Sequence, residues 1–328
     1  MTRIGFVGVG AISGIYLENI TKRFKDIEII GVCDLIRERA ENAVKKYNIP
    51  KLYNDMYELF ADPEVDVVSI CTPNDQHEEM AIAALKAGKH VVAHKPLCTS
   101  LEELDAIEGD FTLRFMTSHP KDATEKLMDV MAAGKHIAHH FHLPMQSGSD
   151  TILHRMNRHY DTERYLQIVR GLRERMPDIT LTSDIIVGFP GETEEDFVEL
   201  CEFVKEAKFE HLGVFPYSRE EDTPAYDFED QIDEQIKQDR ADIIMQEQLD
   251  INTANNEKMV GKTITVLCED YDPVARVHFG RSAADAPDID TKVYFKNALG
   301  KKRIAPGSFV DVKIEEAVDY DLIGKTVK

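Results

Sequence analysis

The chain has 328 residues, of which 43% are hydrophobic and 30% are charged, and this indicates a globular protein large enough for two or three domains. Its 60 acidic residues outnumber the 39 basic ones, and the net charge of −21 disfavours non-specific binding to nucleic acid, for which no local basic patch is present either. No apolar run reaches membrane-spanning length and no signal peptide is visible, so we expect a cytoplasmic location without a membrane partner.

Strands and helices alternate regularly over the first hundred residues. Strands are expected over residues 3–9, 27–33, 65–72 and 89–93, and helices over residues 17–24, 37–47 and 76–87. Apolar strands separated by helices are typical of parallel βαβ units. We therefore predict a Rossmann-like parallel sheet over residues 1–109.

The same alternation continues through the middle of the chain. Strands are expected over residues 112–118, 137–143, 179–187 and 211–217, and helices over residues 124–133, 161–176, 194–207 and, long and polar, 231–258. This pattern predicts a (βα) half-barrel with a connector helix over residues 110–258. An open doubly wound sheet or a closed barrel running through both parts remains an alternative.

The pattern becomes β-rich from residue 261. Short strands are expected over residues 263–269, 274–279, 292–295 and 308–317, separated by Gly, Pro and Asp. Residues 259–328 are therefore predicted to form a small C-terminal β-barrel or sandwich. The fold class is α/β, with a Rossmann-like parallel sheet joined to a half-barrel and followed by this small β-barrel.

A glycine-rich turn joins the first expected strand to the first expected helix. Gly8, Gly10 and Gly14 have the spacing Gly-x-Gly-x-x-Ser-Gly, in which Ser13 replaces the third glycine of the strict pattern. Such a turn lets a pyrophosphate approach backbone N–H groups and a helix N-terminus. Asp34 ends the second strand, where an acid is the expected acceptor for an adenosine ribose hydroxyl. These residues predict a nucleotide cofactor site.

The residues near Asp34 bear on which dinucleotide this site would take. An acid at the end of the second strand favours NAD. Arg37 and Arg39 follow closely in the sequence and leave NADP open.

Two further segments carry a resemblance to a known family. Residues 71–77 (Cys-Thr-Pro-Asn-Asp-Gln-His) follow a strand, and residues 87–97 contain His94-Lys95-Pro96. With the glycine-rich turn and Asp34, these motifs resemble the N-terminal domain of the Gfo/Idh/MocA oxidoreductases, which act on sugars, inositols and related polyols. The resemblance covers residues 2–107.

This resemblance implies roles for several residues. The nicotinamide-ribose region would be lined by Thr72, Pro73, Asn74 and His77. Lys95 would be catalytic, since it matches the Lys of the family's Glu-Lys-Pro element, which positions or polarises the substrate hydroxyl. His94 stands in place of the Glu. The family's second, mainly β-sheet domain has no counterpart in this sequence, so we expect NAD or NADP binding rather than dehydrogenation.

A different family is suggested by the rest of the chain. The motifs are residues 142–150 (His-Leu-Pro-Met-Gln-Ser-Gly-Ser-Asp), 182–193, 214–218 and 280–287. Over residues 112–328 they resemble radical S-adenosylmethionine methylthiotransferases of the MiaB/RimO type, from the second half of the barrel through the TRAM domain. Residues 112–193 look most like the branch that modifies tRNA adenosines. The chain from His211 onward looks like the branch that modifies a ribosomal protein, so a ribosomal-protein contact through the TRAM-like domain is expected.

The second resemblance implies an S-adenosylmethionine pocket at the ends of the strands. By analogy Gln146, Ser147 and Ser149 would line it, Arg158 would face the ligand's carboxylate, and Asp184 would shape the adenosyl side. These assignments rest on the resemblance alone.

The cysteines argue against the radical chemistry of that family. The five are Cys33, Cys71, Cys98, Cys201 and Cys268. No two are close enough for a CxxC or CxxxCxxC cluster, so we expect neither structural zinc nor a 4Fe–4S cluster. Without that cluster reductive cleavage of S-adenosylmethionine has no electron donor, and no radical catalysis is expected.

Histidines are dense just before the 142–150 motif. The group comprises His136, His139, His140 and His142, with His94 and His119 on other strand ends. A zinc or iron site is conceivable, but a polar barrel rim without metal is the favoured interpretation.

Three hypotheses follow. The first is a methylthiotransferase-related hybrid that carries a nucleotide-binding Rossmann unit and lacks radical catalysis. The second is an NAD(P)-dependent oxidoreductase of the Gfo/Idh/MocA type. The third is a recombined or designed α/β fold that binds NAD and has no native activity. The first covers the most residues, and the third agrees best with the incomplete catalytic sets.

Overall fold

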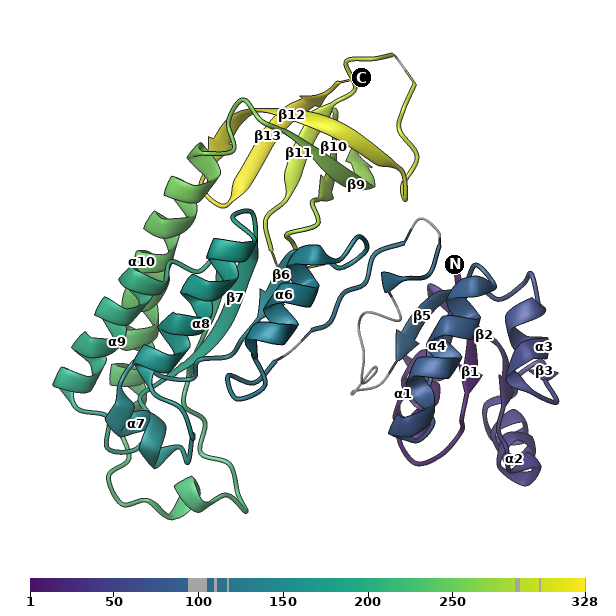
Figure 1. Cartoon of the computed structure of the whole chain (residues 1–328), viewed down its shortest axis with the longest axis horizontal. Helices are drawn as coiled ribbons and strands as arrows, with labels where there is room; N and C mark the ends of the chain where they lie inside the picture. The colour runs from purple at the N-terminus through teal and green to yellow at the C-terminus, as the bar shows by residue number, and fades with distance from the viewer. Residues whose placement is uncertain (94–104, 109–110, 117, 287–289, 301, 328) are drawn as a thin grey trace. The chain divides into compact units, whose positions relative to one another are not determined.

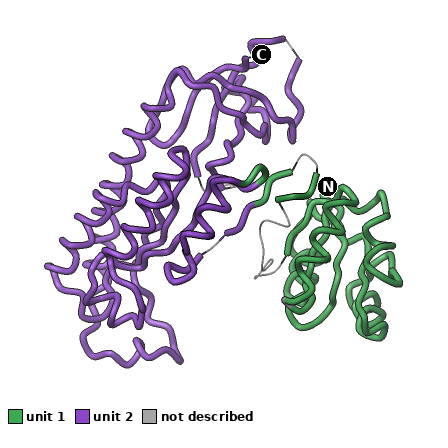
Figure 2. The backbone as a smooth tube through the Cα atoms, viewed as in Figure 1, with its two compact units in different colours: residues 1–113, 134–136 green, residues 114–133, 137–328 purple. Residues whose placement is uncertain are grey.

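The computed structural model describes residues 1–93, 105–108, 111–116, 118–286, 290–300 and 302–327. The chain divides into two compact units, coloured separately in Figure 2. Unit 1 comprises Met1–Leu113 together with Gly134–His136, and unit 2 comprises Arg114–Ala133 together with Ile137–Lys328. No helix of the described part is long and apolar enough to cross a membrane.

Unit 1 is built on a parallel sheet with the strand order β3-β2-β1-β4-β5 (Figure 1). The strands are β1 (Thr2–Val7), β2 (Ile27–Cys33), β3 (Lys51–Leu52), β4 (Val67–Ile70) and β5 (His90–Ala93). β2 and β4 lie on opposite sides of β1, so the winding of the chain changes direction there. Ligands of open parallel sheets bind at the carboxyl ends of strands at such a switch point. The order confirms the predicted Rossmann-like sheet.

The helices of unit 1 connect these strands. They are α1 (Ser13–Lys22), α2 (Arg37–Tyr47), α3 (Met56–Ala61) and α4 (His77–Lys86), with the 3-10 helix η1 (Asn74–Gln76) before α4. Leu17 of α1 and Ala40 of α2 are buried in one core with Phe6 and Val32 of the sheet. The sequence did not indicate β3 and α3, because elements of two and six residues are too short to show a periodic pattern.

The end of unit 1 is attached to a short segment from later in the chain. The Asp105 carboxylate accepts hydrogen bonds from the backbone N–H groups of Lys135 at 2.9 Å and His136 at 2.6 Å. The Phe111 ring stacks on the His136 ring, with centroids 4.0 Å apart. The Leu113 N–H donates to the His136 carbonyl at 2.8 Å. These contacts explain why residues 134–136 belong to unit 1.

The strand predicted over residues 112–118 is wrong. Of its described residues only Leu113 forms a bridge, and it is an isolated one. The reason is that the segment makes single backbone hydrogen bonds to different parts of the chain and does not pair continuously with a neighbouring strand. In unit 2, the Ser118 N–H donates to the His142 carbonyl at 3.0 Å.

Unit 2 contains an open parallel sheet in the order β6-β7-β8. Its strands are β6 (His140–His142), β7 (Thr180–Val187) and β8 (His211–Pro216), and its helices are α6 (Glu125–Ala133), α7 (Asp150–Arg155), α8 (Thr162–Arg175), α9 (Glu194–Ala207) and α10 (Glu234–Glu257). Phe141, Leu181 and Ile185 are buried in the core. Because side chains alternate along a strand, the opposite face carries His142 and Asp184. This open sheet with its helices is the predicted half-barrel.

The C-terminal part of unit 2 is a closed barrel in the order β10-β11-β13-β12-β9, labelled in Figure 1. The strands are β9 (Thr263–Asp272), β10 (Val277–Arg281), β11 (Val293–Lys296), β12 (Phe309–Val318) and β13 (Asp321–Thr326). Val266, Val293 and Phe295 are fully buried in its core. The barrel confirms the prediction, although β13 was missed because its Gly and Lys residues obscure the strand pattern.

Candidate functional site

The glycine-rich turn of unit 1 lies against the end of β4. Gly8 has φ +86°, and a Cβ added to it would lie 2.9 Å from both the Cys71 carbonyl oxygen and Cγ2 of Thr72. Only glycine fits here, because the backbone is left-handed and the neighbouring strand end is too close for a side chain. At Gly10, by contrast, no atom lies within 4 Å of the position that a Cβ would take. The turn is therefore tightly packed at Gly8 and open at Gly10.

Asp34 fixes the same turn from the end of β2. Its Oδ2 accepts a hydrogen bond from the Val9 N–H and its Oδ1 one from the Ile36 N–H, both at 2.8 Å. Each carboxylate oxygen keeps a second lone pair for a ligand hydroxyl. The sequence indicated Asp34 but not Val9 or Ile36, because donors that belong to the backbone leave no side-chain signal.

Ser13 begins α1 and forms a hydrogen bond with the glycine-rich turn. Its side chain is buried, and its Oγ donates to the Gly10 carbonyl at 2.7 Å. No side-chain oxygen caps the first turn of α1, whose N-cap position is Ile12. The backbone N–H groups of that turn are thus left for solvent or an anionic ligand.

The residues after β4 complete this edge of the sheet. The His77 Nε2–H donates to the Thr72 carbonyl at 2.8 Å, and the Thr72 hydroxyl contacts Sδ of Met80 at 3.4 Å. Pro73 is exposed and Asn74 opens η1. The structure therefore brings Gly8, the Asp34 carboxylate and the start of the 72–77 segment to one edge. Lys95 lies outside the described residues, as do His94 and Cys98.

A second group of predicted residues lies after β6 in unit 2. Gln146 has φ 75°, which is unusual for a residue other than glycine. Its N–H donates to the Asp184 carbonyl and its own carbonyl accepts from the Ile186 N–H, both at 2.9 Å. The backbone pairing with β7 holds Gln146 in this conformation, and such local strain is often found at functional positions.

Ser147 and Ser149 use their hydroxyls inside the fold. The Ser149 N–H donates to Oγ of Ser147 at 3.2 Å, and the Ser149 hydroxyl donates to Oδ1 of Asp196 at 2.6 Å. Both serines are almost completely buried. Between them, a Cβ on Gly148 would lie 2.7 Å from Cα of Leu200. The segment thus packs against α9, and both serine hydroxyls are engaged inside the fold.

Arg158 and Asp184 are the charged residues of this second group. Nε of Arg158 is buried and has no hydrogen-bond partner among the residues that the structure describes. Asp184 is half-buried, and its Oδ2 lies 3.3 Å from Nε2 of His142, whose Nδ1 lies 2.8 Å from Oγ1 of Thr182. The network aligns polar groups along one face of the sheet. An unsatisfied guanidinium nitrogen is the kind of group that an anionic ligand would satisfy.

The histidines are dispersed among different contacts. His136 stacks on Phe111, and His139 pairs with Asp178 at 2.8 Å. Burial lowers the pKa of His140 to about 4, with further lowering by the charges of Arg114 and His142. Within the part of the chain that the structure describes, no three His, Cys, Asp or Glu side chains are grouped so as to hold a metal ion.

The described cysteines do not fit an iron–sulfur cluster. Cys33 and Cys71 are in unit 1, whereas Cys201 lies on α9 and Cys268 lies inside the barrel. Burial raises the pKa of Cys33 to about 12 and also raises the pKa of Cys71. These are protonated core thiols, and a cluster needs several thiolates at one point.

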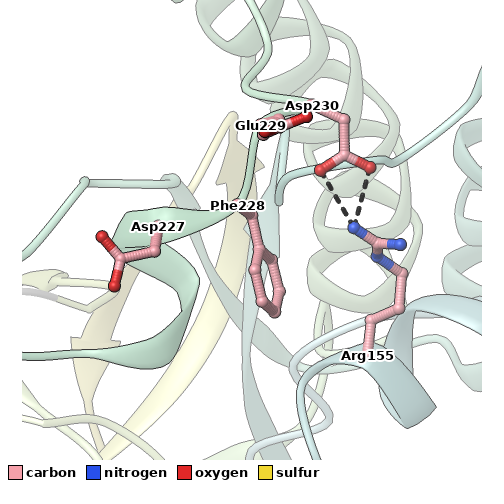
Figure 3. A pocket seen from close by; sticks show the side chains of 5 residues that line it. All are labelled: Arg155, Asp227, Phe228, Glu229 and Asp230. Atoms are coloured by element: carbon pink, nitrogen blue, oxygen red, sulfur yellow. Dashed lines mark hydrogen bonds and ion pairs between the residues drawn. The ribbon is translucent and has the colours of Figure 1, made fainter.

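A pocket of about 550 Å³ lies in unit 2 beside α7 (Figure 3). It is lined by Arg155, Asp227, Phe228, Glu229 and Asp230. Nη2 of Arg155 binds both oxygens of Asp230, at 3.0 and 2.8 Å, and the guanidinium lies 5.3 Å from the centre of the Phe228 ring. Sequence reasoning selected none of these residues as a site, because Arg155 and Asp230 are 75 positions apart and their pairing leaves no local pattern.

Three family models match the chain. Residues 2–108 match the oxidoreductase family with an NAD-binding Rossmann fold, residues 67–204 match the radical SAM superfamily, and residues 260–327 match the TRAM domain. The first two matches overlap over residues 67–108. In the structure, the strands β4 and β5 of this overlap belong to the sheet of unit 1, and the helix α4 connects them.

Curated relatives match the larger part of the chain. The ribosomal protein uS12 methylthiotransferase RimO of Clostridioides difficile is 42% identical over 239 residues, which are 73% of this chain and 53% of that protein. The protein of the same name from Clostridium acetobutylicum is 35% identical over 291 residues, 88% of this chain and 64% of that protein. The chain thus spans about half to two thirds of the length of these relatives.

Among solved structures, the myo-inositol dehydrogenase of Lactobacillus casei in complex with NAD(H) and myo-inositol is 31% identical. The match covers 31% of this chain and 30% of that one, with a TM-score of 0.30. The family models and the curated relatives show that the sequence is a mosaic. Its first part is similar to Gfo/Idh/MocA oxidoreductases, and the remainder is similar to radical SAM methylthiotransferases with a TRAM domain.

Proposed function

We propose that unit 1 binds NAD or NADP at the edge formed by the ends of β1, β2 and β4. The observation that carries this proposal is the shape of the glycine-rich turn, which is closely packed against the end of β4 at Gly8 and has open space at Gly10. The pyrophosphate would lie at Gly10 and the uncapped first turn of α1, supported by Ser13. Asp34 would accept from the adenosine ribose, and Thr72, Pro73, Asn74 and His77 would line the nicotinamide ribose.

This proposal is one of binding, without turnover of a substrate. A bound dinucleotide supplies a hydride carrier, and dehydrogenation also needs a substrate held against the nicotinamide with a base within reach. Lys95 is the proposed group for that task and stays a prediction. The second domain of the oxidoreductases has no sequence counterpart, so we propose that the dinucleotide serves as a bound ligand.

For unit 2, we propose a methylthiotransferase-derived scaffold that does not perform radical chemistry. The support is the absence of a CxxxCxxC motif from the sequence and the separate positions of Cys201, on α9, and Cys268, inside the barrel. The activity of the uS12 methylthiotransferases is therefore not transferred to this chain. Contact with a ribosomal protein through the TRAM-like barrel, and a cytoplasmic location, are further parts of the proposal.

Binding of S-adenosylmethionine is the second candidate function. It is favoured by one observation, the buried Nε of Arg158, which no described residue satisfies. Gln146, Asp184 and the backbone around Ser147 and Ser149 would form the rest of the pocket. These groups can orient and hold a ligand, and no reaction is proposed there.

Thermal unfolding with added ligands tests these proposals. A ligand present at about 100 times its Kd stabilises a protein by about 2.7 kcal/mol, which shifts the melting temperature by several degrees. We expect such a shift with NADH, and adenosine monophosphate serves as a control for non-specific nucleotide effects. The absence of a shift with NADH and NADPH, in a folded sample, would contradict the binding proposal.

Iron analysis tests the proposed lack of radical chemistry. After anaerobic incubation with iron and sulfide and removal of unbound metal, we expect less than one iron per four chains and no visible charge-transfer band. About four irons per chain, with cleavage of S-adenosylmethionine under reducing conditions, would contradict this part of the proposal.

A further inference from the structure

We infer that Asn54 and Glu41 make the proposed dinucleotide site of unit 1 selective for NAD over NADP, because they hold the Arg37 side chain in contacts of its own. The inference rests on the proposed function, since it concerns which dinucleotide that site accepts. It assigns specificity to two residues that do not themselves contact the ligand.

Arg37 is the residue nearest to Asp34 that could receive a 2′-phosphate. It is the first residue of α2 and follows Asp34 by three positions. Asp34 itself comes directly after β2 and belongs to the proposed site. A guanidinium at this place in a dinucleotide fold is the group that accommodates the additional phosphate of NADP. Its planar set of donors suits a phosphate well, provided that they are free to turn toward it.

In this structure those donors already have partners. Nη1 of Arg37 donates to Oδ1 of Asn54 at 2.7 Å, and Nε of Arg37 pairs with Oε1 of Glu41 at 3.3 Å. Both contacts are exposed, so each contributes modestly. Together they engage Nε and Nη1 and hold the guanidinium in this orientation, so turning it toward a phosphate requires at least one of the two contacts to be broken.

Asn54 is itself fixed in the orientation that accepts from Arg37. Its Nδ2 donates to both carboxylate oxygens of Glu58, at 2.9 and 3.0 Å, and its backbone N–H donates to Oε2 of Glu58 at 2.8 Å. The hydrogen bonds from Asn54 lower the pKa of Glu58, so this carboxylate is ionised at neutral pH. Because the amide nitrogen faces Glu58, the amide oxygen must face away from it, toward Arg37.

The charges around Arg37 also favour NAD over NADP. Asp34, Glu41 and Glu58 are acidic, and the Arg37 guanidinium is neutralised by the pair that it makes with Glu41. A 2′-phosphate would therefore meet the Asp34 carboxylate beside an Arg37 guanidinium that is already paired. An unphosphorylated ribose would meet the same carboxylate as a hydrogen-bond acceptor. The arrangement thus favours NAD.

The test compares the Kd values of NADH and NADPH. The chain contains no Trp, so the fluorescence of the reduced nicotinamide can be followed without a tryptophan background. For the wild-type chain we expect NADH to bind about tenfold or more tightly than NADPH, equivalent to about 1.4 kcal/mol. In the double variant Asn54→Ala with Glu41→Ala, the ratio of the two Kd values should fall at least about fivefold, through tighter NADPH binding.

Two controls separate release of Arg37 from a general effect of charge or stability. Adding Arg37→Ala to the double variant should restore the original ratio, because the released guanidinium is then gone. Glu38→Ala removes an acid from the same turn of α2 and should leave the ratio unchanged within about twofold. Circular dichroism of each variant verifies that it is folded.

The outcomes distinguish the inference from the proposed function. If the folded wild-type chain binds neither dinucleotide, the proposed function fails. If NADH binds but the double variant keeps the wild-type ratio, or Glu38→Ala changes it as much as the double variant does, the inference is overturned. Equal binding of NADH and NADPH by the wild type would also overturn it.

Discussion

Asp105 accepts a hydrogen bond of 2.6 Å from the backbone N–H of His136, 31 positions further along the chain. The same carboxylate accepts from the Lys135 N–H, so one side chain satisfies two successive backbone donors. Replacing Asp105 with Ala leaves both donors without this partner, and we expect unfolding of unit 1 to become easier by about 1–3 kcal/mol. Thermal unfolding followed by circular dichroism measures the effect. Glu108→Ala, an exposed acid nearby, is the matched control, and an equal loss in both variants would contradict the assigned role.

Gly8 provides the most direct test of the proposed cofactor cradle. A Cβ at this position would lie 2.9 Å from the Cys71 carbonyl oxygen, and the positive φ adds strain. We therefore expect Gly8→Ala to weaken NADH binding by at least about tenfold and to lower stability by about 1–3 kcal/mol. Gly88 also has a positive φ of 74° but has open space around it. Gly88→Ala should share the backbone strain and retain NADH binding in a fluorescence titration. Retained binding in Gly8→Ala would contradict the proposed site.

The raised pKa of His211 predicts a loss of stability at alkaline pH. Nε2 of this histidine lies 3.5 Å from Oδ1 of Asp285, and Nδ1 lies 3.7 Å from Oδ1 of Asp290. Burial acts to lower the pKa of His211, but the hydrogen bond that it donates to Asp285 and the charges of Asp290, Asp285 and Glu210 outweigh it, so the pKa is raised. A raised pKa contributes stability below the unfolded value of about 6.5, and this is lost as the pH rises through the folded value.

The measurement is the free energy of unfolding of the full chain between pH 6 and pH 9. We expect His211→Gln to remove the part of the decline that His211 causes, whereas His139→Gln, an exposed pair with Asp178, should keep the wild-type slope. Identical slopes in the wild type and in His211→Gln would show that the ion pairs do not form.

The lowered pKa of His140 predicts that the protein loses stability as the pH falls. The pKa of His140 is lowered to about 4, first by burial and then by the charges of Arg114 and His142. A buried neutral histidine contributes stability above pH 6.5 that is lost as the pH falls from 6.5 toward 4. The expected loss is on the order of 3 kcal/mol. His140→Phe should flatten the stability profile in this range, and a profile that stays as steep as that of the wild type would contradict the assignment.

The buried ion pair between Arg240 and Glu192 is expected to be critical for unit 2. Nη1 of Arg240 lies 2.6 Å from Oε1 of Glu192, whose side chain is 1% exposed. Glu192→Ala leaves the guanidinium buried without its partner, and the expected loss is about 3–5 kcal/mol of unfolding free energy. Glu194 also contacts Arg240, at 3.2 Å, but is 75% exposed. Glu194→Ala should therefore lose no more than about 1 kcal/mol, and denaturation of both variants in urea compares them.

Much of the architecture could be predicted from the sequence, because its long elements carry periodic patterns. The parallel strands β1, β2 and β4, the helices α8 and α9 and most barrel strands follow alternation or helical periodicity. β3, α3 and β13 lack enough residues or enough apolar residues to show a pattern. Residues 112–118 have the composition of a strand, but their described residues make single backbone bonds, from Leu113 to His136 and from Ser118 to His142, and local composition does not reveal these.

The sequence could indicate which residues meet at the strand ends but not the contacts that they make there. The sequence placed Gly8 and Asp34 at adjoining strand ends, since the order of parallel strands follows from the βαβ pattern. It could not show that both oxygens of Asp34 hold backbone N–H groups, or that the Ser149 hydroxyl is bound to Asp196. Such contacts depend on the third dimension, because the partners of Ser149 and Asp34 are set by packing rather than by spacing.

Closure of the C-terminal barrel has a consequence for how the chains behave toward one another. The barrel pairs each of its five strands on both sides, whereas β5 ends its sheet and pairs, among the described residues, with β4 alone. Val92 on β5 is 59% exposed. Unpaired edges of this kind can accept a strand from another molecule, and mutual repulsion at a net charge of −21 opposes such encounters. Salt screens that repulsion, so aggregation measured by light scattering should increase with ionic strength and should begin at the parallel sheets rather than at the barrel.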